Sequence, residues 1–456
     1  MEGAAPKPAT LRSAFAIAWP ASLAAIVTPL LGLIDIAVLA RGAETYALAG
    51  ASLAGAVISV LYWTFGFLRM SLSGLAAQAI GANDEPRLRA HLVQGAGLGF
   101  AIGLILLLLS PLVIAGAHWL LVESSEASAR AGEAMRTYLG IRLLAAPLAL
   151  TTTAMLGWFT GQGRTGLLML VTISTAAINA VLSIIFVLGL DQGIAGLAAA
   201  TALSELSGFL IACASASFVL TKRGGLKTGW SLSKVREGAS AVISLNLDIF
   251  IRTAILTLVI ASFTRLGAGF GDLTVAANHV LLNIVLTATL LLDGAAIAAE
   301  TLVGQALGAG KSKRELFRAA WQKTAELTAM LTLALLLVLS LFGDQILGIA
   351  IGKGEGNAAL AEEAMHYYPW VIASPLAVAI AFHLDGVYIG ATRGAALRNT
   401  MAASGAVYVT AAFVLIPVFA NHGLWAAFLL FMIARGVGLV LLWPGFTSLT
   451  ATPQHA

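Results

Sequence analysis

The run Ala77-Gln78-Ala79-Ile80-Gly81-Ala82 returns in the second half of the chain as Gly304-Gln305-Ala306-Leu307-Gly308-Ala309. A second pair of runs, Ala145-Ala146-Pro147-Leu148-Ala149-Leu150 and Ala373-Ser374-Pro375-Leu376-Ala377-Val378, has nearly the same separation. Further matches follow in the same order, with Gly161 and Arg164 matching Gly390 and Arg393, and Gln192-Gly193 matching His422-Gly423. Chance similarity between segments rich in Ala and Leu would not keep this order. We therefore predict that the chain consists of two like halves.

The composition places both halves in a membrane. Hydrophobic residues make up 59% of the 456 residues and charged residues 11%, whereas a soluble domain carries about 25% charged residues. Twelve apolar stretches reach the roughly 20 residues that a spanning helix needs. They cover residues 13–40, 46–79, 91–122, 135–160, 166–189, 194–220, 238–266, 273–307, 319–350, 367–389, 397–419 and 424–442. The prediction is an all-α polytopic membrane protein with about 12 transmembrane helices in two pseudo-symmetric six-helix lobes.

Lys and Arg are distributed unequally between the two sides of the membrane on which the predicted connections lie. Sixteen lie on the side that holds the N-terminus, and five lie on the other side. The positive-inside rule assigns the richer side to the cytoplasm. We therefore expect a multi-pass protein of the bacterial inner membrane with both termini cytoplasmic. The short polar N-terminus indicates no cleavable signal peptide.

The halves suggest a division into lobes. We expect an N-terminal six-helix lobe at 1–220, a basic cytoplasmic linker at 221–237 and a C-terminal six-helix lobe at 238–456. Six spans in each half mean that both halves enter from the same side, so the repeat is parallel. Two lobes around a central cavity suit alternating access. No stretch resembles a selectivity filter, which argues against a channel.

Asp35 is the strongest candidate for a functional residue. It lies in the first apolar stretch with no basic residue within a helical turn, and charged groups in a membrane are costly and commonly functional. Burial disfavours the charged form of a carboxyl, so Asp35 can bind and release protons during transport. Pro20 and Pro29 precede it, and proline kinks helices. The alternative is a carboxylate that only holds a neighbouring helix.

Four further polar residues of the N-terminal half stand in pairs. Asn179 and Ser183 are four residues apart in the fifth stretch, and Thr201 and Glu205 are four apart in the sixth, so each pair shares a helix face. These residues are predicted to form a polar network around Asp35. The alternative is interhelical hydrogen bonding without a transport role.

The C-terminal half carries its own ionisable residues. Asp248 and Arg252 are four apart, which favours an intrahelical ion pair, and Lys323 and Glu326, three apart, favour another. A second cation site is possible in this half. Its candidate residues are Asp248, Arg252, Asp293, Glu300 and Asp385, with His383 nearby.

Several other classes of protein are disfavoured. The single Cys213 excludes a disulfide framework and a cysteine-based metal site. The run Gly310-Lys311-Ser312 ends like a phosphate loop, but Gln305 stands where that loop needs glycine, which argues against ATP as the energy source. A membrane-embedded enzyme is disfavoured because no His-Glu-x-x-His or similar spacing occurs. We expect no metal, no cofactor and no nucleic-acid partner.

With these residues in place, the chain resembles the multidrug and toxic compound extrusion (MATE) family, and within it the DinF (DNA-damage-inducible) branch. The resemblance covers about residues 10–445. It rests on seven runs. They are 29–40 around Asp35, the twin runs at 77–82 and 304–310, 245–253 with Asp248 and Arg252, 276–278 with Asn278, 292–295 with Asp293, and 299–304 with Glu300.

The resemblance implies a secondary active antiporter that exports amphipathic, cationic organic compounds as protons or sodium ions enter. It implies a protonatable Asp at position 35. Some related members also use an Asn, an Asp and a Thr, which here correspond to Asn179, Ser183 and Thr201. Because Ser183 replaces a carboxylate, protons are favoured over sodium. The partners expected are small amphipathic substrates and membrane lipids, with the protein acting as a monomer. The alternative within the superfamily is a flippase for lipid-linked oligosaccharides, with Arg69, Arg142 and Arg252 contributing positive charge.

Overall fold

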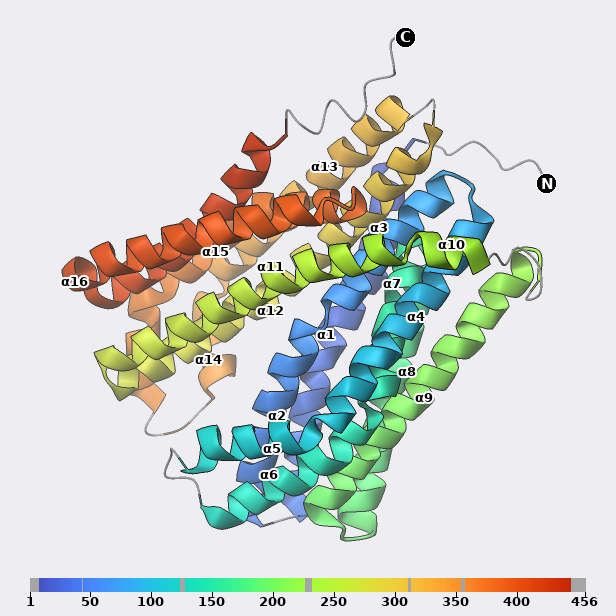
Figure 1. The fold of residues 1–456 in the computed structure, drawn as a ribbon. Coiled ribbons are helices and arrows are strands. Elements are labelled where there is room, and N and C mark those ends of the chain that lie inside the picture. The colour runs from blue at the N-terminus through green and yellow to red at the C-terminus, as the bar shows by residue number, and fades with distance from the viewer. Residues whose placement is uncertain are drawn as a thin grey trace. The chain divides into compact units, whose positions relative to one another are not determined.

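The computed structural model describes residues 8–42, 44–123, 128–225, 232–310, 313–352, 354 and 357–443. Within these ranges the chain is helical and has no β-strand (Figure 1). The α-helices are α1 (Leu11–Gly42), α2 (Thr45–Thr64), α3 (Phe67–Gly81), α4 (Glu85–Leu108), α5 (Ser110–His118), α6 (Ala129–Arg142), α7 (Ala146–Gly161), α8 (Thr165–Ser183), α9 (Gly193–Lys222), α10 (Leu232–Glu237), α11 (Ala239–Gly267), α12 (Asp272–Gly308), α13 (Lys313–Leu341), α14 (Gly343–Ile351), α15 (Asn357–Gly390) and α16 (Gly394–Leu441). Short π-helical or 3₁₀ segments are η1 (Trp119–Glu123), η2 (Leu143–Ala145), η3 (Ile184–Gly189) and η4 (Ala268–Phe270).

The number of spans confirms the prediction of about twelve. Eleven helical stretches within the described residues are long and apolar enough to cross a membrane, with α2 and α3 together forming one of them. The stretch of α16 is broken at Ala420, whose φ of 47° and ψ of −125° are not helical. Gly423 lies against the backbone of Leu415 just after this break, where a β-carbon would clash. Because the chain turns back there, α16 contributes two spans.

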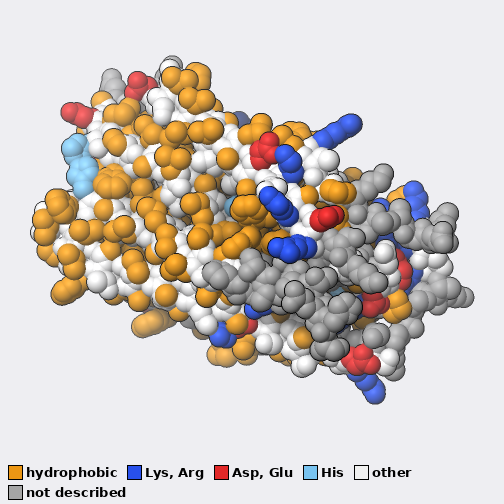
Figure 2. Space-filling view, turned by 90° about the horizontal axis from the view of Figure 1, so that it is seen from above, with side chains coloured by type: hydrophobic (Ala, Val, Ile, Leu, Met, Phe, Trp, Pro, Cys, Tyr) orange, Lys and Arg blue, Asp and Glu red, His pale blue; other side chains and the backbone are white. Residues whose placement is uncertain are grey.

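The surface matches a membrane protein. Figure 2 shows hydrophobic side chains spread over a broad part of the visible face, with Lys and Arg side chains gathered elsewhere on it. Exposed apolar side chains such as Phe413, Ile349 and Leu112 are 70–84% accessible. Such exposure would be costly in water and is expected in lipid.

The contacts divide the chain into two compact units. One unit holds Ala77–Asn83 and the described residues of Met1–Ser22 and Ser244–Ala456. The other holds Leu23–Ala76 and the described residues of Asp84–Ile243. Helix α1 therefore contributes its first turns to one unit and the remainder, with Asp35, to the other.

In the unit that holds Asp35, α4 packs on α7, α2 on α6, and α8 on α9. Glycines explain the close contact of the first pair. Gly99 and Gly103 are four apart on α4, and a β-carbon at either would meet the backbone of Leu150 or of Pro147 on α7. Small residues at this spacing let two membrane helices approach closely.

In the other unit α12 packs on α13 and α15, and α15 packs on α16. The twin runs of the sequence repeat also meet here. Gly81 lies against the backbone of Gln305, and Gly308 lies against the backbone of Gln78. The amide of Gln78 donates to the carbonyl of Gly390 at 3.0 Å. The twin runs thus form a reciprocal contact in which each glycine faces the glutamine of the other copy.

Lys323 and Glu326 form the expected ion pair at 2.6 Å, so that prediction is confirmed. Pro20 lies buried inside α1, and the kink predicted there stays a prediction. The side chain of Pro29 and residues 226–231 of the predicted linker lie outside the part that the structure describes.

Candidate functional site: a polar cluster around Asp35

Asp35 lies half-buried in α1. Its Oδ1 accepts a hydrogen bond from the hydroxyl of Ser183 at 3.1 Å. Ser183 is fully buried and is the last residue of α8 before the chain continues as the π-helix η3. Departures from regular α-helix of this kind often occur at functional positions. Within the described residues the Asp35 carboxyl has no salt-bridge partner.

Asn179 lies one turn before Ser183 on the same face of α8. It is fully buried, and neither its amide nitrogen nor its amide oxygen has a hydrogen-bond partner among the described residues. A buried amide without partners is costly, so such groups are rare in structures. The hydrogen-bonding capacity of Asn179 is therefore available to a ligand or to water.

Arg142 and Glu205 form a buried ion pair between α6 and α9. The hydroxyl of Tyr62, on α2, donates to Glu205 Oε2 at 3.5 Å and accepts from Arg142 Nη1 at 3.5 Å. The Arg142 guanidinium also lies 5.1 Å from the centre of the Tyr62 ring. The guanidinium is thus fixed by a carboxylate, a hydroxyl and an aromatic face.

Tyr138 joins this ion pair to the surroundings of Asp35. It lies one turn before Arg142 on α6 and is buried. Its hydroxyl lies beside the side chain of Thr201 and interacts electrostatically with Asp35, Arg142 and Glu205. Thr201 itself donates to the carbonyl of Leu197 at 2.9 Å. Helices α1, α2, α6, α8 and α9 therefore contribute to one polar cluster, which we call the Asp35 cluster.

The four predicted partners of Asp35 occupy different positions relative to its carboxyl. Ser183 contacts Asp35 directly, Thr201 reaches the cluster through Tyr138, Glu205 pairs with Arg142, and Asn179 contacts no polar partner among the described residues. The sequence reasoning missed Tyr62 and Tyr138. Tyr138 and Arg142 are four apart, the same spacing that identified the other pairs, so this signal was available.

In the other unit the prediction of an ion pair between Asp248 and Arg252 is wrong. Arg252 instead pairs with Asp385 on α15, and Arg435 on α16 pairs with the same carboxylate at 2.6 Å. Asp248 pairs with Arg398 near the start of α16. Spacing along one helix shows only which residues share a face, and here neighbouring helices supply the partners.

The remaining C-terminal candidates do not join into one site. Glu300 is buried and Asp293 is half-buried on α12. His383 is buried on α15, and its ring nitrogens have no hydrogen-bond partner among the described residues. Within those residues no three His, Cys, Asp or Glu side chains converge as a metal site would require.

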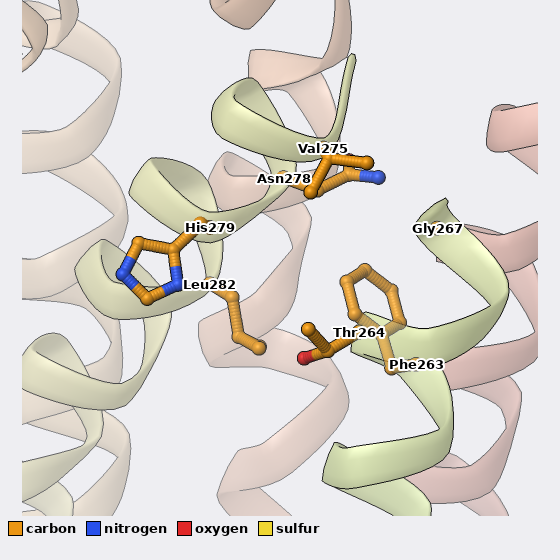
Figure 3. A pocket seen from close by; sticks show the side chains of 7 residues that line it. All are labelled: Phe263, Thr264, Gly267, Val275, Asn278, His279 and Leu282. Carbon is orange, nitrogen blue, oxygen red and sulfur yellow. The ribbon is translucent and has the colours of Figure 1, made fainter. Parts of the chain in front are cut away.

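A small pocket lies between α11 and α12. Figure 3 shows Thr264 of α11 pointing toward Leu282 of α12, with Asn278 and His279 along the same wall. Asn278 exchanges two hydrogen bonds with Asn421, at 2.7 and 3.0 Å, and accepts a third from the Trp425 indole at 2.8 Å. Its polar atoms are therefore used in fastening α12 to α16.

Comparison with known proteins identifies the family. The model of the MatE family matches residues 20–185 and again residues 249–415, once in each half of the chain, as the internal repeat predicts. The DNA damage-inducible protein F of Escherichia coli K12 is 32% identical over 434 residues, which cover 94% of this chain and 90% of that protein.

Two further proteins extend the comparison. A probable multidrug resistance protein NorM of Bradyrhizobium diazoefficiens is 29% identical over 91% of this chain and 84% of its own length. A solved structure described as the outward-facing conformation of a multidrug resistance MATE family transporter has a TM-score of 0.83 at 18% identity, over 98% of this chain and all of that one. The chain therefore belongs to the MatE family of membrane transporters and is not an enzyme.

Proposed function

We propose that this protein is a secondary active multidrug efflux antiporter, which exports amphipathic cationic organic compounds in exchange for protons. The observation that carries the proposal is the environment of the Asp35 carboxyl. Its carboxyl lies inside a membrane-spanning helix with one hydroxyl donor and no salt-bridge partner among the described residues. A group held in this way can gain and lose a proton without breaking an ion pair.

The names of relatives support export. Relatives that span most of this chain include a probable multidrug resistance protein, and a neighbour of the same fold is a multidrug resistance transporter. Those descriptions belong to the relatives. Together with the uncompensated carboxyl they favour a transporter of organic cations.

The mechanism follows from the charge of Asp35. The ionised carboxyl attracts a cationic substrate into the cluster, and a proton from the outside then cancels the charge. The protein has two conformations, and protonation favours the one that releases substrate outside because it removes the attraction. After the proton leaves to the cytoplasm, the charge is restored and the cycle repeats.

Two alternatives are weakened by the contacts. A flippase for anionic lipid-linked sugars needs free positive charge, but Arg142 and Arg252 each have a carboxylate partner. A second cation site from Asp248, Arg252, Asp293, Glu300 and Asp385 stays a prediction. It is disfavoured because Asp248 and Asp385 are already neutralised by arginines.

We further propose that the protein lies in the bacterial inner membrane as a monomer, in contact with lipids, with both termini in the cytoplasm. Its lobes are 1–220 and 238–456, joined by the linker 221–237. Both described ends of the linker contact α4. Arg89 donates to the carbonyls of Arg223 and Gly225 at 2.9 and 3.0 Å, and Gln94 donates to the carbonyl of Val235 at 2.7 Å.

The test is efflux of a fluorescent cationic dye from cells that lack their own exporters. Cells with the wild-type protein are expected to retain less dye than cells with Asp35→Asn, and an uncoupler should abolish the difference. Equal amounts of both proteins in the membrane are the control. Dye export by Asp35→Asn at the wild-type rate would overturn the role of Asp35.

A further inference from the structure

The Asp35 cluster contains two carboxylates and one permanent cation. Asp35 and Glu205 are the acids, and Arg142 is the cation, paired with Glu205 and interacting electrostatically with Asp35. Guanidinium groups do not lose their proton in proteins. The cluster therefore has a net charge of about −1 when Asp35 is ionised and about zero when Asp35 is protonated.

The oxygen atoms of this cluster are of the kind that hard metal cations prefer. Two carboxylates, the hydroxyls of Ser183, Thr201, Tyr62 and Tyr138, and the amide oxygen of Asn179 lie on five neighbouring helices. Carboxylate, hydroxyl and carbonyl oxygens are the ligands of hard cations. With two carboxylates and no internal cation, such a set would attract Na⁺.

Arg142 already supplies a positive charge to this set of oxygens. Its guanidinium is buried, bonded to Glu205, bonded to the Tyr62 hydroxyl and packed over the Tyr62 ring. We propose that Arg142 is a tethered internal cation that sets the ion specificity of the Asp35 cluster. Its charge neutralises Glu205 and repels Na⁺. The remaining negative charge, on Asp35, is therefore neutralised by a proton rather than by Na⁺.

This inference rests on the proposed proton-coupled export but makes a separate claim about ion binding. Two like charges a few ångströms apart in a medium of low dielectric constant repel strongly. Sodium therefore has to displace the guanidinium from Glu205, whereas a proton binds Asp35 directly and leaves the pair intact. Arg142 acts on specificity through its charge and is a positioning residue rather than a ligand.

The test is Na⁺ binding to purified protein, measured with radioactive sodium and by the shift of thermal stability with added NaCl against added KCl. The wild-type protein is expected to respond equally to the two salts. Arg142→Gln leaves two carboxylates without an internal cation and should bind Na⁺ about tenfold more tightly or better, because one repelling charge is gone. Arg142→Lys keeps the charge and should remain indifferent to Na⁺.

A second set of variants decides the matter if Arg142→Gln does not fold. The double variant Arg142→Gln/Glu205→Gln removes both charges of the pair and should not gain Na⁺ binding. Adding Ser183→Asp to it places a second carboxylate beside Asp35 and should create Na⁺ binding. Ser183→Asp combined with Glu205→Gln alone keeps Arg142 as an unneutralised cation and should bind Na⁺ about tenfold less tightly.

Sodium binding by the wild-type protein as tight as that by the variants without Arg142 would overturn the proposal. So would equal Na⁺ affinity of the two Ser183→Asp proteins. Because these are binding measurements, they remain decisive even if pH-driven export is not observed. Absence of export by the wild-type protein would contradict the proposed function and leave the ion specificity to be judged on binding alone.

Discussion

Gly81, at the end of α3, lies against the backbone of Gln305 on α12. The equivalent residues of the other half, Gly308 and Gln78, repeat this contact in reverse. Since Gly81 matches Gly308 and Gln78 matches Gln305 in the twin runs, the contact lies on the symmetry of the repeat. The most recognisable motif of the sequence is thus a packing motif, in which glycine allows two backbones to approach.

Adding a methyl group at this contact should destabilise the protein. Gly81→Ala and Gly308→Ala are each expected to cost about 1–3 kcal/mol of unfolding free energy, because the new β-carbon meets backbone atoms that cannot move aside. Unfolding in mixed detergent and SDS measures the change. Gly97→Ala, where the β-carbon enters open space on α4, is the matched control and should be neutral or slightly stabilising. Equal loss in all three variants would argue against the contact.

The hydrogen bond from Ser183 should tune the pH response of export. Ser183→Ala removes the hydroxyl that stabilises the ionised Asp35 carboxyl, worth about 1.5 kcal/mol. Asp35 then keeps its proton to higher pH, so the midpoint of the pH profile of efflux should rise by about one pH unit. Ser207→Ala on α9, whose hydroxyl only bonds Leu203 of its own helix, is the control. An unchanged midpoint in Ser183→Ala contradicts the assigned contact.

Asp385 should matter for folding because two buried arginines depend on it. Asp385→Asn leaves Arg252 and Arg435 without a carboxylate and is expected to cost about 3–5 kcal/mol of stability. Glu326→Gln breaks the exposed pair with Lys323 and should cost less than about 1 kcal/mol. Unfolding measurements on both variants compare the two pairs. An Asp385→Asn protein with wild-type stability but altered coupling would restore the idea of a C-terminal cation site.

The amides of Asn278 and Asn421 should behave as a unit. Asn278→Ala leaves the amide of Asn421 and the indole of Trp425 without this partner, and Asn421→Ala leaves the amide nitrogen of Asn278 without its acceptor. Each single change is expected to cost about 1–3 kcal/mol, while the double change should cost clearly less than the sum of the two. The exposed Asn283, whose amide is hydrogen-bonded to His279 on its own helix, provides an Asn283→Ala control that should be nearly neutral. Additive losses for Asn278 and Asn421 would show that the two amides are not coupled.

Much of the fold could be predicted from the sequence because lipid imposes a simple rule. Spanning helices must be apolar and about 20 residues long, so their number and approximate positions follow from composition. The break within α16 was also expected near Ala420, since the predicted stretches ended at 419 and resumed at 424. The break between α4 and α5 was missed, because Ser110-Pro111 interrupts a stretch that stays apolar throughout.

The partners of the charged residues were harder to predict. Asp248 and Arg252 share a helix face, yet each binds a residue more than 130 positions away. Asp35 and Ser183 are 148 residues apart, and only the tertiary fold brings these two positions of α1 and α8 together. Sequence spacing identifies the face on which a charge lies, while the choice of partner depends on which helix packs there.

The central claim is that protonation of Asp35 drives export, and transport in proteoliposomes tests it most directly. Purified wild-type protein and Asp35→Asn are reconstituted, and uptake or release of a fluorescent cation is followed under an imposed proton gradient and, separately, under an imposed sodium gradient. We predict that the wild-type protein responds to the proton gradient alone and that Asp35→Asn responds to neither. Proton-driven transport by Asp35→Asn at the wild-type rate would contradict the account.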